Sequence, residues 1–489
     1  MFTNKLSFNF VFFIFLDMKL TLSELDILIF LLFYLTLTFL GFFPIIFKKT
    51  KTSEDLEFIF AGRKLTLPFF VASLVATWYG NILGIGEFVY RYGVVAWFCF
   101  GIVYYISAFF YALLITKKAH LSNASTIAEL IAGKFGTKAG IFSAFVQLII
   151  SFPAVYILMV ATFINLLTGI DLFLSILLGT LLSFIYIGFG GFKSNILTNT
   201  FQFFIMYLGF GVFLFFSLNS IQFDIGFLSN LPTSHKKFFG NVSWQFLFSW
   251  FFISLQTFVD PSFYQRCISA KSPKIARVGI LFSIILWMIF DFMTIFIGLI
   301  SRAALPDIKP LFAYPYLLEV VVPDVWKGFI LVAMLATIIS TMDSYIFLSA
   351  FIIGNDILGK ISGLKKLKVS KRTKLGLILS AIFSITLASL IPSAIDLIYK
   401  TSSIAVPALF YPLLLSFSKK DLLSNSQTTF LIASSSILTL FFSIIKEYVS
   451  YKSMFTPFQQ ILVFEPMVFG FLWSTIVFLI MFIYNQKAK

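Results

Sequence analysis

The sequence predicts an all-α polytopic membrane protein with about thirteen transmembrane helices. Of its 489 residues, 59% are hydrophobic and only 12% are charged, whereas a soluble domain carries about 25% charged residues. Apolar runs of about twenty residues recur from end to end, and each is long enough to cross a hydrocarbon core of about 30 Å. These runs are rich in Phe, Leu and Ile and do not alternate with polar residues, as the strands of a membrane β-barrel would.

The spans follow one another with short polar connections. They are expected near 25–47, 68–91, 94–116, 139–168, 171–189, 196–218, 243–265, 276–301, 326–357, 373–392, 395–417, 427–448 and 466–485. No loop is long enough to fold separately, so residues 1–489 are expected to form a single transmembrane domain. The apolar segment 8–16 is too short to be a further span, and Met18 is an alternative start of the chain.

The basic residues indicate how the chain lies in the membrane. The net charge is +15, but the Lys and Arg side chains occupy short connections between apolar runs, so a nucleic-acid partner is not indicated. Of the 36 basic residues, 25 fall on the side that holds the C-terminus and ten on the other. The positive-inside rule therefore predicts an integral protein of the plasma (cell inner) membrane, with the N-terminus outside and the C-terminus in the cytoplasm.

Other classes of function find no support in the residue types present. Cys99 and Cys267 fall in or next to predicted spans, so neither a disulfide nor a metal site is expected from them. His120 and His235 lie in loops and are expected to be solvated. No nucleophile–base pair, phosphate-binding loop or metal-ligand spacing occurs, so we expect no enzyme, no organic cofactor and no obligate protein partner beyond the lipid bilayer.

The ninth predicted span carries an unusual number of oxygen-bearing side chains. Ser340 and Thr341 stand side by side there, and Asp343 and Ser344 follow closely. Such groups are costly at membrane depth and often mark the path of a substrate or ion. A purely structural alternative is that the hydroxyls bond carbonyl groups four residues back in their own helix.

The second predicted span contains Gly80, Gly84 and Gly86, followed by Glu87. One glycine in a membrane helix often serves close helix packing. Three in one crossing, each lowering helix stability by up to about 1 kcal/mol against alanine, favour a broken helix whose free carbonyls line a cavity.

Four motifs occur in order along these spans. They read FAGRKL with SLVATWYGNILG and YRYG around the second span, GGFKSNILTNTFQ in the sixth, DPSFYQRCISAKS ending the seventh, and ATIISTMDS through NDI in the ninth. Together they resemble the sodium/solute symporter family over roughly residues 25–450. The resemblance implies a LeuT-like core at about 68–417, built of two inverted five-helix repeats (spans 2–6 and 7–11), with flanking helices.

The resemblance also implies a sodium site between the second and ninth spans. Its ligands would be the carbonyls of Ala76, Tyr79 and Thr337 and the hydroxyls of Ser340 and Thr341. Many members carry aspartate where this chain has Asn199, at a position that serves an additional cation, so one coupled Na⁺ is expected here.

The remaining candidates concern a substrate pocket or its gates. They are Trp78, Gly80, Glu87, Trp250, Asp291 and Asp343, with Tyr79 and Phe251 as further aromatic groups. Intramembrane charges are functional candidates, although Glu87 could lie in an outer vestibule, Asp343 at a solvated helix end, and Asp291 in a neutral, hydrogen-bonded state. Gln265 and Arg266 match the family's Q-R pair at the inner end of the seventh span, and the resemblance implies a structural or gating anchor there. The 68 phenylalanines are expected to face lipid rather than line a pocket.

The sequence thus predicts a secondary active transporter that couples Na⁺ to a small polar organic solute by alternating access. Two alternatives stay open at this point. One is a proton-coupled carrier in which Asp291 or Glu87 titrates, and the other is a sensor with a transporter fold that binds solute without accumulating it.

Overall fold

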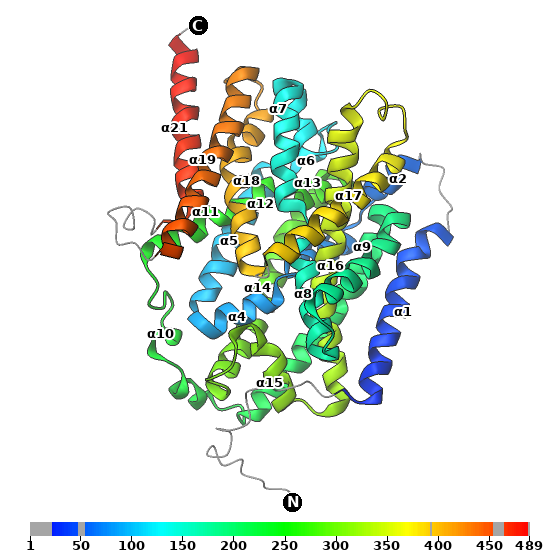
Figure 1. Ribbon diagram of the computed structural model, residues 1–489, viewed down its shortest axis with the longest axis vertical. Coiled ribbons are helices and arrows are strands. Elements are labelled where there is room, and N and C mark those ends of the chain that lie inside the picture. Colours follow the sequence, from blue (N-terminus) through cyan, green and yellow to red (C-terminus); the bar gives the residue numbers. More distant parts are fainter. Residues whose placement is uncertain (1–21, 47–53, 392–393, 453–463, 488–489) are drawn as a thin grey trace, which may run out of the picture.

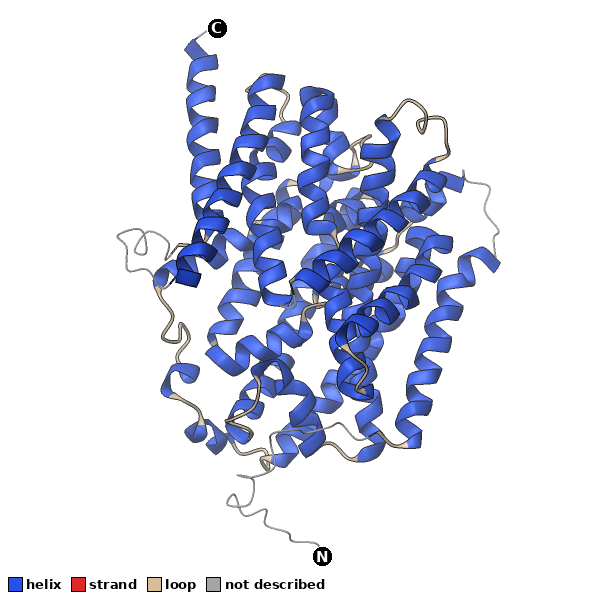
Figure 2. Cartoon of the chain, viewed as in Figure 1, coloured by secondary structure: helices blue, strands red, loops and turns tan. Residues whose placement is uncertain are grey.

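The computed structural model describes residues 22–46, 54–391, 394–452 and 464–487, and all of its regular elements are helices (Figures 1 and 2). The segment 8–16 and Met18 lie outside these ranges. The first half contains α1 (Glu24–Ile46), α2 (Glu54–Phe60), α3 (Leu67–Trp78), α4 (Ile82–Tyr92), α5 (Val103–Leu114), α6 (Thr116–His120), α7 (Ile127–Ser151), α8 (Ala154–Thr168) and α9 (Leu172–Ser220). The second half contains α10 (Thr233–Lys236), α11 (Trp244–Ser254), α12 (Gln256–Val259), α13 (Pro261–Ser269), α14 (Pro273–Ala304), α15 (Ala313–Val321), α16 (Asp324–Ile352), α17 (Val369–Leu390), α18 (Ala394–Ser416), α19 (Asn425–Lys452) and α21 (Pro466–Lys487).

The helices confirm the predicted fold class. Within the described ranges nine helices are long and apolar enough to cross a membrane, or ten if the bent pair α3 and α4 counts as one span. The count of thirteen stays a prediction. The two spans expected at 171–189 and 196–218 correspond to the two parts of α9, which together run for 49 residues without a longer connection. Its two parts meet at a kink at Gly191 (φ 63°), where a Cβ atom would lie 2.5 Å from the carbonyl oxygen of Phe58.

The predicted break in the second span is confirmed. Helix α3 ends at Trp78 and α4 begins at Ile82, and the two axes differ by 56°. The seventh predicted span is interrupted as well, because it consists of α11, α12 and α13 in succession. Leu65, just before α3, pairs its backbone with Ser269 and Lys271 at the end of α13 at 3.0 and 2.9 Å. The two interrupted spans are therefore fastened to each other at one end.

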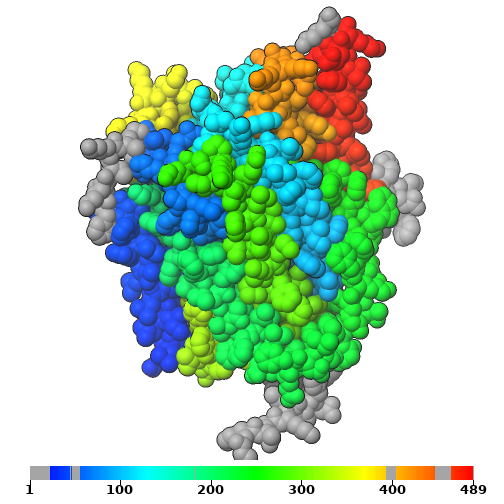
Figure 3. Space-filling model, turned by 180° about the vertical axis from the view of Figure 1, so that it is seen from behind, coloured from blue at the N-terminus to red at the C-terminus, as the bar shows by residue number. Residues whose placement is uncertain are grey.

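Helix α16 lies at the centre of the bundle, in contact with α1, α3, α9 and α17. In the span Asp324–Lys360, which contains α16, 83% of an apolar 18-residue stretch is buried. The corresponding share is 17% for α1 and 33% for α21. Outer helices expose large apolar side chains such as Phe282 and Phe292 of α14, as expected of a lipid-facing surface. The space-filling view from behind shows residues from the middle of the chain, in green, across the centre and lower right of the face (Figure 3).

The expectation that His235 is a solvated loop residue is wrong. Its side chain is buried, and Nε2 lies 3.0 Å from the carbonyl oxygen of Tyr90 at the end of α4. The backbone N–H of Val94 donates to the carbonyl of His235 at 3.0 Å. Gly93 (φ 76°) permits this approach, since a Cβ there would lie 2.3 Å from the His235 Cα. The segment between α9 and α11 is thus held against the end of the second span.

This contact predicts a pH dependence of stability. Burial lowers the pKa of His235 from 6.5, the charge of Arg302 acts in the same direction, and the hydrogen bond to Tyr90 opposes them. The unfolded chain then binds more protons than the folded protein near this pH. The stabilisation is present above pH 6.5 and declines as the pH falls through that value. Thermal unfolding from about pH 5 to about pH 8 should show that His235→Gln weakens this dependence, and an identical dependence in the variant would contradict the assignment.

Candidate functional site

The break between α3 and α4 leaves backbone carbonyls of α3 without helical partners, and side chains of α16 meet them. The hydroxyl of Ser340 donates to the carbonyl of Ala76 at 2.8 Å and to that of Thr337 at 2.9 Å. The hydroxyl of Thr341 donates to the carbonyl of Thr77 at 2.9 Å and lies 3.4 Å from that of Ala76. Last-turn carbonyls need such partners because no further helical N–H reaches them. We call these five oxygens the oxygen cluster.

The oxygen cluster contains four of the five predicted sodium ligands, namely Ala76, Thr337, Ser340 and Thr341. The fifth, Tyr79, caps the end of α3, and its hydroxyl donates to the carbonyl of Trp287 on α14 at 2.8 Å. Sequence reasoning missed the carbonyl of Thr77. The glycines that follow it indicated a broken helix, but not which carbonyls the break would release.

Gly80 provides the close approach that this cluster requires. A Cβ at this position would lie 2.4 Å from the Thr341 Cβ and 2.6 Å from Cε1 of Tyr156 on α8. Gly84 and Gly86 lie in the helical part of α4, where a Cβ would meet Asn81 and Tyr314. Of the three glycines of the motif, Gly80 therefore allows the close approach at the break, whereas Gly84 and Gly86 allow packing contacts within and around α4.

A second polar cluster lies one turn further along α16 and surrounds a buried arginine. Arg266 of α13 is fully buried and donates to the Thr77 hydroxyl at 2.6 Å and to the Ser344 hydroxyl at 3.3 Å. It also donates to the carbonyls of Ser73 and Ser262, at 3.1 and 3.2 Å. Its guanidinium lies 5.8 Å from the ring of Phe192 on α9. The anchor predicted at Arg266 therefore binds α3 and α16 together.

Asn199 of α9 completes this second polar cluster. We call the group of Arg266, Thr77, Ser344 and Asn199 the guanidinium cluster. Its side chain lies 3.1 Å from the Thr77 hydroxyl and 3.0 Å from the Ser344 hydroxyl. With the amide oxygen facing these hydroxyls, the amide nitrogen donates to the carbonyl of Ser340 at 3.2 Å. Arg266 thus donates to the two hydroxyls, and they face the neutral amide of Asn199 rather than a carboxylate.

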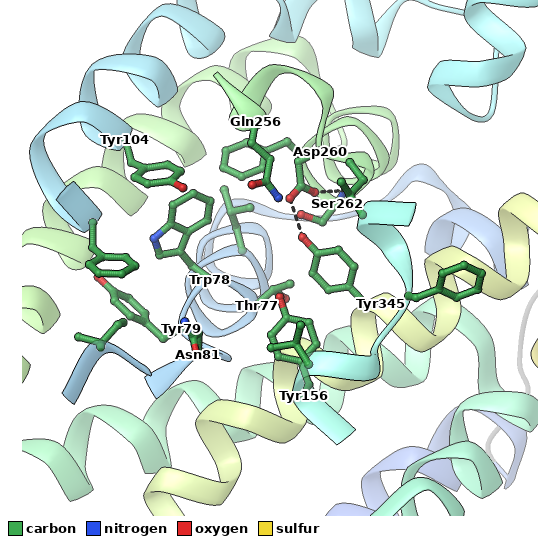
Figure 4. Close-up of a pocket in the computed structure, with 17 residues that line it drawn as sticks. Thr77, Trp78, Tyr79, Asn81, Tyr104, Tyr156, Gln256, Asp260, Ser262 and Tyr345 are labelled. Carbon is green, nitrogen blue, oxygen red and sulfur yellow. Dashed lines mark hydrogen bonds between the residues drawn. The ribbon is translucent and has the colours of Figure 1, made fainter. Parts of the chain in front are cut away.

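An open cavity lies beside both clusters, between the interrupted spans and α8 (Figure 4). Thr77, Trp78 and Tyr79 from the break line it, as do Tyr156 of α8 and Asp260 at the start of α13. Thr77 contributes its carbonyl to the oxygen cluster, its hydroxyl to the guanidinium cluster, and a part of the cavity wall. Neither Tyr156 nor Asp260 was singled out from the sequence, although Asp260 opens the quoted DPSFYQR motif.

Two predicted acidic residues lie elsewhere in the bundle. Asp343 is buried and accepts a hydrogen bond from the hydroxyl of Tyr186 on α9. Asp291 of α14 is buried and accepts one from the hydroxyl of Tyr105, just inside α5. Neither lines the cavity, so their roles as gates or proton sites stay predictions.

Three further candidates lie outside the cavity wall. Glu87 pairs with Arg91 one turn later at 2.7 Å. Trp250 is buried behind the wall, and its ring centroid lies 4.5 Å from that of the lining residue Phe100. Phe251 is 42% exposed on the outside of α11. Of the predicted aromatic groups, Trp78 and Tyr79 line the cavity in this structure.

The fold and the site together define a polytopic helical membrane protein with an oxygen-lined cluster and a cavity between two interrupted spans. The model of the sodium:solute symporter family matches residues 58–425. The chain belongs to this family.

Individual relatives are distant. The sodium-coupled monocarboxylate transporter 2 of Mus musculus is 25% identical over 284 residues, which are 54% of this chain and 45% of that protein. The match thus spans less than half of that relative's length. The sodium/pantothenate symporter of Haemophilus influenzae is 25% identical over 352 residues, which are 68% of this chain and 72% of that protein.

Among solved structures, a Na⁺-coupled sialic acid symporter in a substrate-bound outward-open state superimposes with a TM-score of 0.74. The match has 15% sequence identity and covers 94% of this chain and 96% of that chain. This likeness supports the LeuT-like arrangement of the helices and carries no information on the solute.

The contact at Gly80 generates a test of the packing at the break. Gly80→Ala would place a methyl group inside the Thr341 side chain, and overpacking of this kind costs about 1–3 kcal/mol. We expect the variant to melt at a lower temperature than the unchanged protein in detergent.

Gly211→Ala is the matched control, because a Cβ at that position in α9 has no neighbour within 4 Å. It should not lower the melting temperature, since alanine favours a helix over glycine. Equal melting of Gly80→Ala and the unchanged protein would show that α3 and α16 do not approach this closely.

Proposed function

We propose that this protein is a secondary active transporter that couples the entry of Na⁺ to the symport of a small polar organic solute by alternating access. The observation that carries the proposal is the oxygen cluster between the α3 break and α16, next to a cavity. Family membership supports the same conclusion, because the named relatives are sodium-coupled transporters.

The oxygen cluster has the chemistry that a sodium ion requires. Hard cations bind oxygen ligands, and Ala76, Thr77, Thr337, Ser340 and Thr341 bring three carbonyl and two hydroxyl oxygens together. All five ligands are neutral, so a bound ion keeps its charge and can leave again during each cycle. The hydroxyl hydrogens that now point to the carbonyls would turn away, and the oxygens would then face the ion.

We further propose that one Na⁺ is coupled. The guanidinium cluster supports this, because Arg266 donates to the hydroxyls of Thr77 and Ser344 and so places a fixed positive charge there. A second cation at these hydroxyls would meet that charge without a carboxylate to offset it, since Asn199 is neutral.

Coupling would operate through Thr77 and its neighbours at the break. An ion at the oxygen cluster fixes α3 against α16, and this orders Thr77 and Trp78 in the cavity wall. Sodium then raises the affinity for solute, and by reciprocity solute raises the affinity for sodium.

We place the basic end of the molecule in the cytoplasm. Figure 1 shows the loop between α16 and α17 and the end of α21 at one end of the bundle, and the beginning of α1 at the other. The first of these segments carries part of the Lys-rich stretch 360–374, which the positive-inside rule assigns to the cytoplasmic side.

Sodium binding can be measured without knowledge of the solute. Binding of radioactive ²²Na⁺ to the purified protein should saturate at a single site. Ser340→Ala together with Thr341→Ala should weaken it by about tenfold or more, which corresponds to about 1.4 kcal/mol. Ser349→Ala is the control, because this α16 hydroxyl bonds Ser380 at 2.6 Å, away from the cluster. An unchanged affinity in the double variant would remove both residues from the site.

Transport itself should depend on the same ion. In proteoliposomes, uptake of a solute identified by thermal-shift screening should collapse when potassium replaces sodium at fixed pH. Uptake that persists and follows the pH gradient would instead establish a proton-coupled carrier. Sodium-dependent solute binding without any uptake would establish the sensor alternative.

A further inference from the structure

The cavity beside the break carries negative charge and no positive side chain. Asp260 is the acidic residue among the described residues that line it, and the wall contains no Lys, Arg or His. The neutral polar groups of the wall come from Thr77, Asn81, Gln256 and Ser262. Among the described lining residues, the charged side chain is therefore the carboxylate of Asp260.

The carboxylate of Asp260 is held in place by neutral donors. One oxygen accepts the backbone N–H of Ser262 at 2.7 Å, as the cap of α13, and the other accepts the hydroxyl of Tyr345 at 2.6 Å. These bonds fix the direction of the carboxylate, and Figure 4 shows it on the cavity wall beside Gln256. The buried charge of Arg266, the basic residue nearest in sequence, acts on Asp260 electrostatically, but the Arg266 N–H groups donate to other residues.

Aromatic rings make up much of the remaining wall. Eight of the seventeen lining residues are aromatic. Trp78 forms edge contacts with Tyr104 and Phe263 at centroid distances of 5.0 and 5.8 Å. On the other side, the rings of Tyr156 and Tyr345 lie 5.4 Å apart. In Figure 4 Asp260 lies above Tyr345, with the indole of Trp78 to its left and Tyr156 below.

We propose that this cavity binds a small organic cation, an amine or quaternary ammonium compound, with its positive centre near Asp260 and among the rings. Aromatic faces attract cations through their quadrupoles, most strongly where water is excluded. A carboxylate solute would face Asp260 with charge of the same sign and no basic residue in the wall. The proposal deepens the proposed function, since it rests on the cavity being the solute site of the symporter.

The test compares one cation with its uncharged isostere on the full-length protein in detergent. The probes are choline and 3,3-dimethylbutanol, which has a carbon atom in place of the nitrogen, and lactate serves as the anionic probe. Quenching of tryptophan fluorescence and thermal shift report binding in the presence of sodium. We expect choline to bind at least about tenfold more tightly than the isostere, and lactate not to bind.

Asp260→Asn should reduce choline affinity by about tenfold or more, and the affinity for the isostere should stay unchanged. Asn also caps helices well, so the fold is expected to persist, and a thermal melt checks this. Asp171→Asn is the matched control. Asp171 also caps a helix and accepts the N–H of Phe173 at 2.8 Å, but it lies on the exposed end of α9, away from the cavity. The isostere comparison needs no variant and holds even if Asp260→Asn does not fold.

The outcomes separate the two proposals. Binding of lactate in preference to choline, equal binding of choline and its isostere, or no binding of choline would overturn the assignment of the cavity to organic cations. None of these results affects the ²²Na⁺ measurement. Choline binding without sodium-dependent uptake would leave the cation site standing and contradict the symporter.

Discussion

The site depends on the interruption of one membrane helix between Trp78 and Ile82. An intact helix would satisfy the carbonyls of Ala76 and Thr77 with its own N–H groups four residues later. The break removes those partners in a region where water is scarce and unpaired backbone groups are costly. The hydroxyls of Ser340 and Thr341 take their place at 2.8 and 2.9 Å. The same contacts make the oxygen cluster and hold the broken helix to the centre of the bundle.

A buried positive charge is the second constraint. Arg266 is fully enclosed, and burial of an ion costs several kcal/mol unless hydrogen bonds compensate it. Here the compensation comes from carbonyl and hydroxyl oxygens of α3, α13 and α16. Because these helices provide different acceptors, any movement that separates them would remove hydrogen-bond acceptors from the guanidinium or expose it. Arg266 thus connects the two interrupted spans to α16 one turn away from the oxygen cluster.

The negative charge of the site lies in a different place. Asp260 begins the helix that carries Arg266, yet its carboxylate faces the cavity, whereas the guanidinium faces the helix interfaces. The two charged side chains therefore make their hydrogen bonds to different neighbours, although their charges also act on each other. Together with the neutral oxygen cluster, they give the region a group of oxygens without formal charge, a buried cation and an acidic side chain in the cavity wall.

The sequence by itself determined the fold class, the break and most of the oxygen cluster. Long apolar runs that do not alternate with polar residues predict membrane helices, because lipid offers no partner for backbone groups and a helix satisfies them internally. Glycines at 80, 84 and 86 indicated the interruption, and the resemblance named Ala76, Thr337, Ser340 and Thr341. The fold class and the break depend on local composition and spacing, whereas the four residues come from the resemblance to the family. The tertiary structure alone decided the burial of His235, the carbonyl of Thr77, the surroundings of Arg266 and the cavity wall at Tyr156 and Asp260. Their partners lie as many as 267 positions apart in the chain, as between Thr77 and Ser344, and only helix packing determines which of these distant residues meet.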